Sequence, residues 1–249
     1  MNKAEEYFYS DFTQGSYAEL IDLAKSRYPF IGYQEIGDRS RYILWRHDVD
    51  FSMHVAAELA EIEHHKQVKA TYFIYPHSEF YNLFEKEIFL LVKRIQELGH
   101  HIGLHFDSHF YNIQNVNQLE AALIREKELL DRFFQTEIRV FSFHNNNDFT
   151  MGCEEWMYAG LINTYASVFK THIGYCSDSH SIWRFRRLKD VLTSASDDRL
   201  QVLTHPEWWQ KLPMPPRRKM LKCVYGRAES NIRYYDSLLK KMNRPNIDE

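Results

Sequence analysis

The stretch RYILWRHDVD, residues 41–50, begins as an apolar run and turns polar at its end. A short apolar run of this kind is typical of a buried β-strand, so its charged side chains are expected at the carboxyl end of that strand. Further strands are predicted by the same pattern over 68–75 (VKATYFIY), 101–104 (HIGL), 138–144 (IRVFSFH) and 199–205 (RLQVLTH).

Amphipathic helices are expected between these strands, over 16–27, 52–65, 85–98 and 115–135. The first begins with Ser16 and the second with Ser52, and serine is a favourable N-cap residue. Gly99 stands where the C-terminal glycine of a helix belongs. Strands that are nearly continuous apolar runs, alternating with helices, indicate an α/β fold with a parallel sheet covered on both faces.

Aspartates and histidines gather where the predicted strands end. In α/β sheets and α/β barrels the carboxyl ends of the strands carry the ligand site. Separate segments therefore direct reactive side chains toward one mouth, namely Asp48, Asp50, His105, His109, His144 and His205.

The composition excludes several classes of protein. The 249 residues carry a net charge of −3 with both signs mixed, so neither a nucleic-acid surface nor a membrane-binding face is expected. The sequence has no run long and apolar enough for a membrane span, and its first residues lack the pattern of a signal peptide. The three cysteines form no CxxC pair, which favours a reduced, cytoplasmic protein. Without a repeat or a linker, residues 1–249 are expected to form a single domain.

The segment GHHIGLHFDSH, residues 99–109, is the first candidate for a metal site. His105 and His109 are four residues apart, so on a helical turn they would share one face and could bind one cation. A solvated loop whose histidines cap backbone groups is the alternative interpretation.

The carboxylates of RHDVD complete this candidate. Asp48 and Asp50 are two apart at the end of a strand and can face the same side. Two buried carboxylates this close repel each other unless a cation or a proton offsets their charge. Alternatively, one of the two could cap the helix that begins near Ser52. Two histidines and one aspartate would leave a metal position open for water, which is typical of a catalytic rather than a structural zinc site.

Four motifs in chain order, RHDVD, ATYFI, GHHIGLHFDSH and LTHP, resemble those of the polysaccharide deacetylase family (NodB homology, carbohydrate esterase family 4). Residues 99–109 match the second motif of that family, G-H-x-I-G-x-H-x-x-x-H, at every defined position. The resemblance covers residues 41–210, so 1–40 would be an N-terminal extension and 216–243 a C-terminal helix outside the catalytic barrel core.

The resemblance implies a distorted (β/α) barrel and the hydrolysis of acyl groups on sugars. It also implies one divalent metal ion, expected to be zinc, with Asp50, His105 and His109 as the ligands. Asp48 would then be the general base and His205 the general acid.

The sequence departs from the family pattern at several positions. A valine separates the two aspartates, as in a subgroup that includes amide and imide hydrolases, so which aspartate binds the metal is left open. The arginine of the third motif is absent, and His144 or Asn145 would take its place. Further residues expected to bind substrate or to support the ligands are Arg46, which could pair with an aspartate, and His47, Asp178, Trp183 and Trp208.

The function predicted from these features is metal-dependent removal of an N- or O-acyl group from a sugar or small saccharide precursor, in surface-polysaccharide biosynthesis. One alternative is a hydrolase of a C–N bond in a non-sugar amide, imide or ureide. The other is a catalytically drifted protein that binds a saccharide or a partner. The sequence leaves open the acyl group, the sugar and the oligomeric state.

Overall fold

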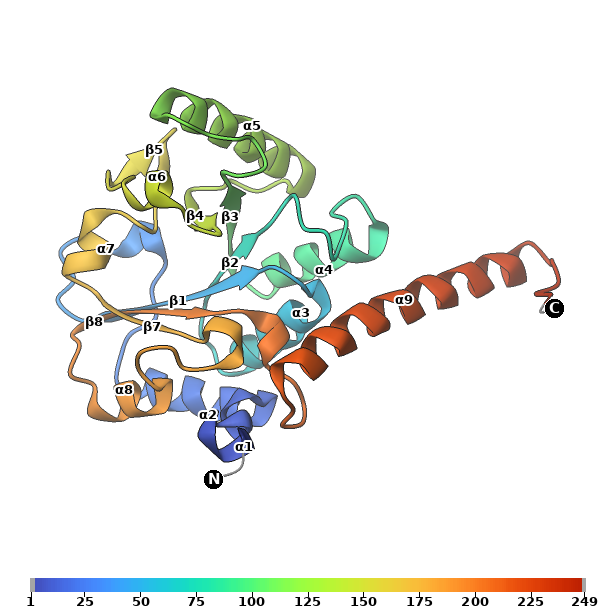
Figure 1. Cartoon of the computed structure of the whole chain (residues 1–249), viewed down its shortest axis with the longest axis horizontal. Coiled ribbons are helices and arrows are strands. Elements are labelled where there is room, and N and C mark those ends of the chain that lie inside the picture. The colour runs from blue at the N-terminus through green and yellow to red at the C-terminus, as the bar shows by residue number, and fades with distance from the viewer. Residues whose placement is uncertain (1–2, 248–249) are drawn as a thin grey trace.

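The computed structural model describes residues 3–247, and its strands form one eight-stranded sheet (Figure 1). The strand order is β5-β6-β4-β3-β2-β1-β8-β7, and only the β5–β6 pair is antiparallel. The strands are β1 (Tyr42–Val49), β2 (Thr71–Ile74), β3 (His101–Asp107), β4 (Val140–His144), β5 (Met157–Tyr158), β6 (Leu161–Asn163), β7 (Gly174–Ser177) and β8 (Arg199–Thr204).

Helices cover the outer side of the curled sheet. The neighbouring pairs α8–α2, α2–α3, α3–α4 and α4–α5 are in contact, so these five helices form a continuous layer. The α-helices are α1 (Lys3–Glu6), α2 (Gln14–Lys25), α3 (Met53–His65), α4 (Lys86–Glu97), α5 (Val116–Phe134), α6 (Asp148–Met151), α7 (Ser167–Thr171), α8 (Leu188–Ser194) and α9 (Pro216–Lys241). Short 3₁₀ turns are η1 (Tyr9–Phe12), η2 (Tyr33–Glu35), η3 (Ser179–Ser181) and η4 (Pro206–Trp208).

The sheet separates two hydrophobic clusters. Ile43, Trp45 and Val49 of β1 belong to the cluster that includes the helices. Tyr42 and Leu44 belong to the second cluster, inside the curl of the sheet. Because successive side chains of a strand point to opposite faces, the residues that follow on the inner side of β1 are Arg46 and Asp48. The inner face is thus apolar where β1 begins and charged where it ends.

A glycine of the GHHIGLHFDSH segment has a packing role inside the curl. Gly103 of β3 pairs in register with Phe73 of β2. A Cβ atom at Gly103 would lie 2.7 Å from the Phe73 ring, which is too close for any larger residue without movement.

The expectation of an α/β fold of the distorted (β/α) barrel type is confirmed by the curled, mostly parallel sheet and its helical cover. Ser52 caps α3 through its side chain, and Gly99 follows α4 with a positive φ of 90°, as expected. The predicted start of the first helix was wrong. Thr13, not Ser16, is the N-cap, because its hydroxyl accepts the backbone N–H of Ser16.

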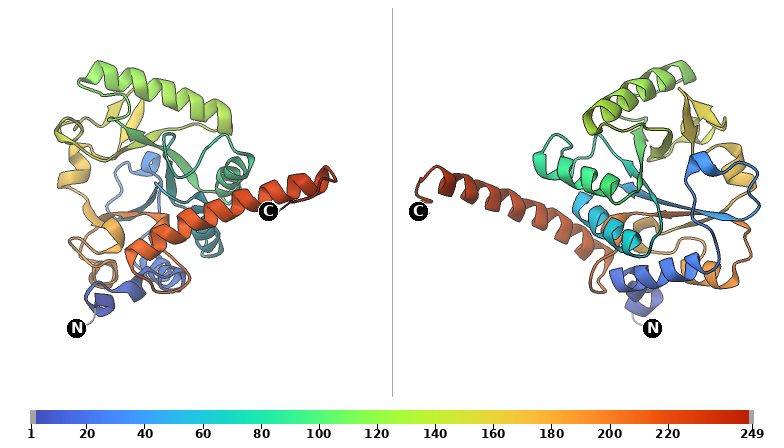
Figure 2. Two further views of the ribbon diagram at one scale, coloured as in Figure 1. Left: turned by 45° about the vertical axis from the view of Figure 1, so that its right-hand side comes forward. Right: turned by 180° about the vertical axis from the view of Figure 1, so that it is seen from behind.

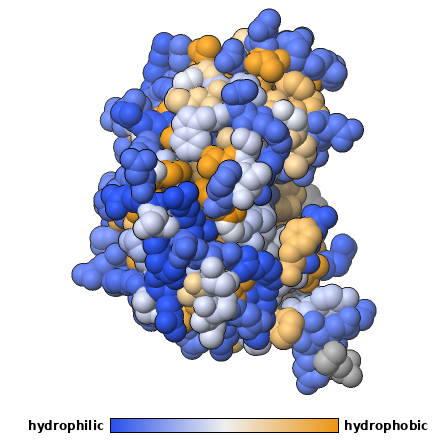
Figure 3. All heavy atoms as spheres, turned by 90° about the vertical axis from the view of Figure 1, so that its left-hand side faces the viewer, coloured by the Kyte–Doolittle hydropathy of each residue, from blue (hydrophilic) through white to orange (hydrophobic). Residues whose placement is uncertain are grey.

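The two ends of the chain differ in how they meet the barrel. The N-terminal segment packs onto it through α2, and Asp11 binds Arg187 through two nitrogens. The helix α9 starts against η4 and then projects away from the body (Figure 2). Within residues 3–247, none of the helices is both long and apolar enough to cross a membrane. The side of the molecule seen in Figure 3 is largely hydrophilic, with small hydrophobic areas between the polar ones.

Candidate metal centre

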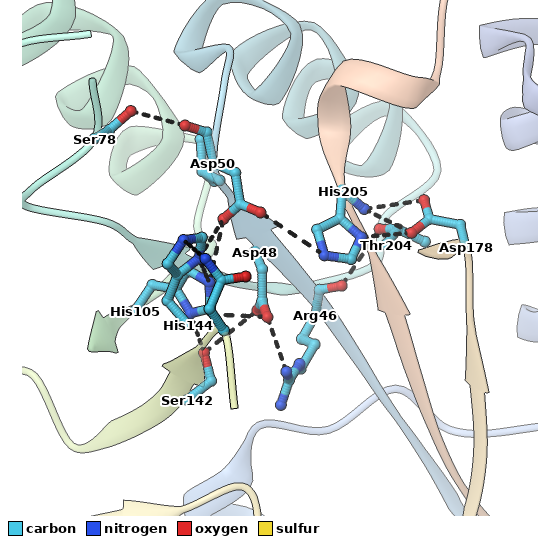
Figure 4. Close-up of polar contacts among 12 residues, drawn as sticks. Arg46, Asp48, Asp50, Ser78, His105, Ser142, His144, Asp178, Thr204 and His205 are labelled. Carbon is cyan, nitrogen blue, oxygen red and sulfur yellow. Dashed lines mark hydrogen bonds and ion pairs between the residues drawn. The ribbon is translucent and has the colours of Figure 1, made fainter. Parts of the chain in front are cut away.

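Three side chains from the strands β1, β3 and β4 converge at the carboxyl end of the sheet (Figure 4). Asp50 follows β1, His105 lies in β3, and His144 ends β4. One carboxylate oxygen and one nitrogen of each ring all lie within 4.8 Å of one another. Asp50 Oδ1 is 3.1 Å from His105 Nε2 and 3.5 Å from His144 Nδ1.

This donor set fits a divalent metal ion. Asp50 Oδ1 is buried and has no hydrogen bond of acceptable geometry, although two imidazole nitrogens lie close to it. An oxygen in that position is expected where a cation, rather than a proton, would connect the three groups. One carboxylate and two imidazoles are the ligands of catalytic zinc sites that retain an open position.

Neighbouring polar groups fix the two histidine rings. His105 Nδ1 lies 2.7 Å from the hydroxyl of Ser142, which leaves Nε2 facing Asp50. Such a contact with the second ring nitrogen is typical of histidines that bind metals. The His144 ring stacks on Tyr75 with centroids 4.3 Å apart, and its Nε2 lies 2.8 Å from the side-chain nitrogen of Asn145.

Burial and neighbouring charges shift the pKa values of Asp50 and His144 in opposite directions. Burial alone would raise the pKa of Asp50, but His105 and His144 hold it well below its usual range. Burial alone would lower the pKa of His144, and the Asp50 carboxylate raises it instead. Without a metal, the negative charge of Asp50 therefore favours the protonated form of the neighbouring His144 ring.

The structure does not bring His109 into this group. Its side chain is exposed, and its Nε2 lies 2.8 Å from the backbone oxygen of Asn145. The i, i+4 spacing brings side chains together on a helix, but β3 continues to Asp107, so His105 lies on a strand and His109 in the turn that follows. The expected pairing of His105 with His109 is therefore corrected: His144 lies beside His105 and Asp50.

Asp48, the expected general base, lies on the inner face of β1 and is buried. Its Oδ2 accepts a hydrogen bond of 2.9 Å from Arg46 Nη2, which forms a fully buried ion pair. The other two nitrogens of this guanidinium have no hydrogen-bond partner among the described residues. The Ser142 hydroxyl lies 3.4 Å from Asp48 Oδ1, so Ser142 contacts both Asp48 and His105.

His205, the expected general acid, follows β8 and is held by Asp178. Asp178 follows β7, the neighbour of β8, and its Oδ1 lies 2.7 Å from His205 Nδ1. The same carboxylate accepts the backbone N–H of His205 and the indole N–H of Trp209. Burial would lower the pKa of His205, but the carboxylate of Asp178, together with the charges of Asp50 and Glu207, raises this pKa to about 10. The free Nε2 is 4.0 Å from Asp50 Oδ2, so His205 faces the cluster.

Two residues expected near the site lie elsewhere. His47 points to the helical side of β1, where it contacts Glu63 and Thr204. It is opposite Asp48 because adjacent residues of a strand alternate between faces. Trp183 donates its indole N–H to Asp11 of the N-terminal segment and stacks on Phe12.

A cavity of about 520 Å³ opens onto the cluster and His205. Trp208 and Asn145 line it. Residues that the sequence did not single out also line it, among them Tyr165, Tyr175, Arg184, Phe185 and Glu207.

Glu207 is the most unusual member of this lining. It is fully buried, and neither carboxylate oxygen has a hydrogen-bond partner among the described residues. Burial, and after it the charge of Asp50, raises the pKa of Glu207 well above its usual value. Its position two residues after His205, in HPEW, was the available signal in the sequence.

The sequence matches no family model, and no curated protein sequence matches it. The structure does resemble solved structures. A family 4 carbohydrate esterase from Bacillus anthracis is 16% identical, with a TM-score of 0.45 and coverage of 86% of both chains.

Two further solved structures are similar to this chain. The Xyl-CE4 domain of a multidomain xylanase from the hindgut metagenome of Trinervitermes trinervoides is 13% identical, with a TM-score of 0.44, covering 84% of this chain and 95% of that chain. A family 4 acetyl xylan esterase from Clostridium thermocellum, solved with a cobalt ion, is 13% identical, with a TM-score of 0.42, covering 82% and 92%. At these identities the likeness concerns the fold, and the chemistry has to be argued from the residues of this chain.

Proposed function

We propose that this chain is a metal-dependent hydrolase that removes an N- or O-acyl group from a sugar or a small saccharide precursor. The observation that carries the proposal is the position of His205 Nε2, 4.0 Å from the carboxylate of Asp50 in the Asp50–His105–His144 cluster. A candidate proton donor thus faces a candidate metal site across a cavity of about 520 Å³.

Asp50, His105 and His144 would hold the ion, for which zinc is the first candidate. A divalent ion in such a site supplies Lewis acidity, which makes a bound water more acidic and polarises an acyl carbonyl. The ring contacts with Ser142 and Asn145 keep the histidines oriented for this role.

Asp48 is proposed as the general base. Its Oδ2 lies 3.8 Å from His105 Nδ1, so the carboxylate borders the cluster without belonging to it. The ion pair with Arg46 fixes the orientation of this carboxylate inside the barrel. From there Asp48 accepts the proton of the attacking water as the tetrahedral intermediate forms.

His205 is proposed as the general acid. Its Nδ1 is held by Asp178, so Nε2 is the nitrogen directed toward the reacting groups. As the C–N or C–O bond breaks, Nε2 gives its proton to the departing amine or alcohol. The buried Asp178 carboxylate keeps the imidazole in the required orientation and stabilises its protonated form.

The cavity supports a small polar substrate. Tyr165, Tyr175 and Trp208 supply aromatic surface, and Arg184 supplies hydrogen-bond donors. Aromatic faces combined with a few polar groups suit a sugar ring, and the volume of the cavity suits a saccharide precursor of a few sugar units. A role in surface-polysaccharide biosynthesis in the cytoplasm is the further part of this proposal.

The test is release of acid from two panels of compounds, acylated sugars and nucleotide sugars in one and non-sugar amides, imides and ureides in the other. Purified protein loaded with zinc is compared with His205→Ala and with the exposed-site control His109→Ala. We expect turnover of an acylated sugar by the wild type and by His109→Ala, and none by His205→Ala. Turnover of the second panel alone would show that the substrate has a non-sugar C–N bond. Saccharide binding without turnover of either panel would contradict the proposal that the chain is a hydrolase.

A further inference from the structure

The helix α9 ends far from the rest of the molecule (Figures 1 and 2). Of its 26 residues only Lys219, in the first turn, is fully buried. Helices in proteins are stabilised mainly by packing of an apolar face, and a helix that packs against nothing is marginal in water. We therefore expect the projecting part of α9 to pack against another surface.

One side of α9 is attached to the body. Lys219 donates to the hydroxyl of Ser181 at 2.7 Å, and Ser230 donates to Glu87 at 3.0 Å. Arg227 forms ion pairs with Glu85 and Glu87 at the start of α4. At 100° per residue, these three side chains of α9 lie within one narrow sector of the helix.

The opposite side of α9 carries a continuous apolar stripe. Its members alternate in steps of four and three residues over three heptads. They are Leu221, Tyr225, Ala228, Ile232, Tyr235 and Leu239 in the helix, and Met242, its C-cap residue. We call this set the α9 stripe. Tyr225, Ile232 and Tyr235 have exposed fractions of 62%, 61% and 57%. A repeat of 3.5 residues is the pattern that a partner helix in a left-handed coiled coil requires.

We propose that the α9 stripe pairs with the α9 stripe of a second copy of this chain, in an antiparallel coiled coil. The stripe faces away from the attached side, so a second helix can approach it without meeting the barrel. In an antiparallel pair about a two-fold axis the stripe is its own partner. The small Ala228 then lies opposite the large Ile232 of the second copy, and Tyr225 lies opposite Tyr235 of the second copy.

Charges beside the stripe select the antiparallel direction. One flank carries Lys222, Glu229 and Asp236, and the other carries the uncharged Val224, Asn231 and Leu238. In an antiparallel pair the charged flank of one α9 lies beside the charged flank of the other. Lys222 of each copy then meets Asp236 of the other copy, and Glu229 lies near the two-fold axis. Lys222 also donates to Gln210 at 2.8 Å, which leaves further protons of its ammonium group for that contact.

An anionic membrane surface is the other occupant to consider, because α9 is rich in lysine and arginine. Glu229 and Asp236 border the apolar stripe and would be drawn toward the negative lipid headgroups. A 3.5-residue repeat drifts by about 20° per heptad around a straight helix, so a supercoiled partner helix follows this stripe better than a flat membrane does. The observations therefore favour a helix of the same chain.

The first experiment measures the molar mass of the full chain by sedimentation velocity over a range of concentrations. We expect a dimer, and a dissociation constant about 100-fold weaker in Ile232→Asp, because the variant places a charge inside the apolar seam. Leu212→Asp is the matched control, since Leu212 is 69% exposed but lies outside α9, and it should remain dimeric. A wild type that stays monomeric at every concentration would overturn the proposal.

The second experiment tests direction by charge exchange. Lys222→Asp and Asp236→Lys should each weaken the dimer, and the double variant should restore it, because only antiparallel helices bring these two residues together. Additive weakening in the double variant would overturn the antiparallel arrangement. If the wild type is monomeric and sediments with phosphatidylserine vesicles, and Ile232→Asp does not, the α9 stripe binds a membrane and not a second copy of the chain. Because α9 holds none of the proposed catalytic groups, these results are independent of the hydrolase proposal.

Discussion

His144 Nδ1 lies 3.2 Å from His105 Nε2, and the two rings meet at an interplanar angle of 83°. Both nitrogens face Asp50 Oδ1, so the pair that shares a prospective metal ion comes from two neighbouring strands. We expect His144→Ala to weaken zinc binding at least about 100-fold, because a ligand is lost outright. Competition with a fluorescent chelator measures this affinity in the purified protein.

The matched control for this prediction is His109→Ala. Its ring contacts the backbone of Asn145 and lies outside the cluster, so its removal should leave zinc affinity within a few-fold of the wild type. The opposite result, loss of zinc in His109→Ala and retention in His144→Ala, would restore the ligand set suggested by the spacing of His105 and His109.

Asp48→Asn should separate metal binding from catalysis. The amide cannot accept a proton as a general base, so we expect kcat to fall by about 10²–10⁴-fold with one zinc retained per chain. The variant also leaves the buried Arg46 without its carboxylate partner, so thermal unfolding must show that it is folded at the assay temperature. Loss of zinc from the folded variant would mean that Asp48, and not Asp50, is the ligand.

Asp178→Asn should act through His205. The amide removes the charge that stabilises the protonated ring and the acceptor that orients it, so we expect kcat to fall by about 10³-fold or more. In a His205→Ala background the same substitution should have almost no further effect on kcat, since its target is absent. Two independent, multiplicative losses in the double variant would show that Asp178 acts on something other than His205.

The fold followed from local patterns that need no tertiary information. The apolar runs ending in Asp48, His144 and His205 are strands because a buried parallel strand is apolar along its whole length. The same two-residue period that places Asp48 and Asp50 together also places Ser142 beside His144. Ser142 could therefore have been identified from the sequence as a neighbour of the site.

The ligand set could not be predicted in the same way, because it depends on the turn after β3. Asp107 determines that turn: its Oδ1 accepts the backbone N–H of His109, and its Oδ2 accepts the hydroxyl of Tyr75. The second contact joins residues 32 positions apart in the chain. Spacing within 99–109 contains no information about it, and a helical spacing rule misplaces His109. Trp183 was misplaced for a similar reason, since its partner Asp11 lies in the N-terminal segment.

Lys219 gives a prediction about stability and pH. The side chain is fully buried, donates to Ser181 and lies with its nitrogen 4.7 Å above the Phe12 ring. Burial lowers its pKa from 10.5 to about 7, and the charge of Asp178 offsets only part of this effect. Between these two values the unfolded chain binds more protons than the folded one, so this residue makes the free energy of unfolding rise as pH increases from about 7 to 10. Lys219→Met should remove that rise, which amounts to up to a few kcal/mol in total. The free energy of unfolding of the variant, minus that of the wild type, is therefore expected to be largest at or below pH 7 and to decrease toward pH 10.

Urea denaturation at a series of pH values measures this difference. Lys240→Met, on the exposed side of the same helix, is the control. An unchanged difference between Lys219→Met and the wild type across this range would show that the Lys219 ammonium keeps its proton in the folded protein.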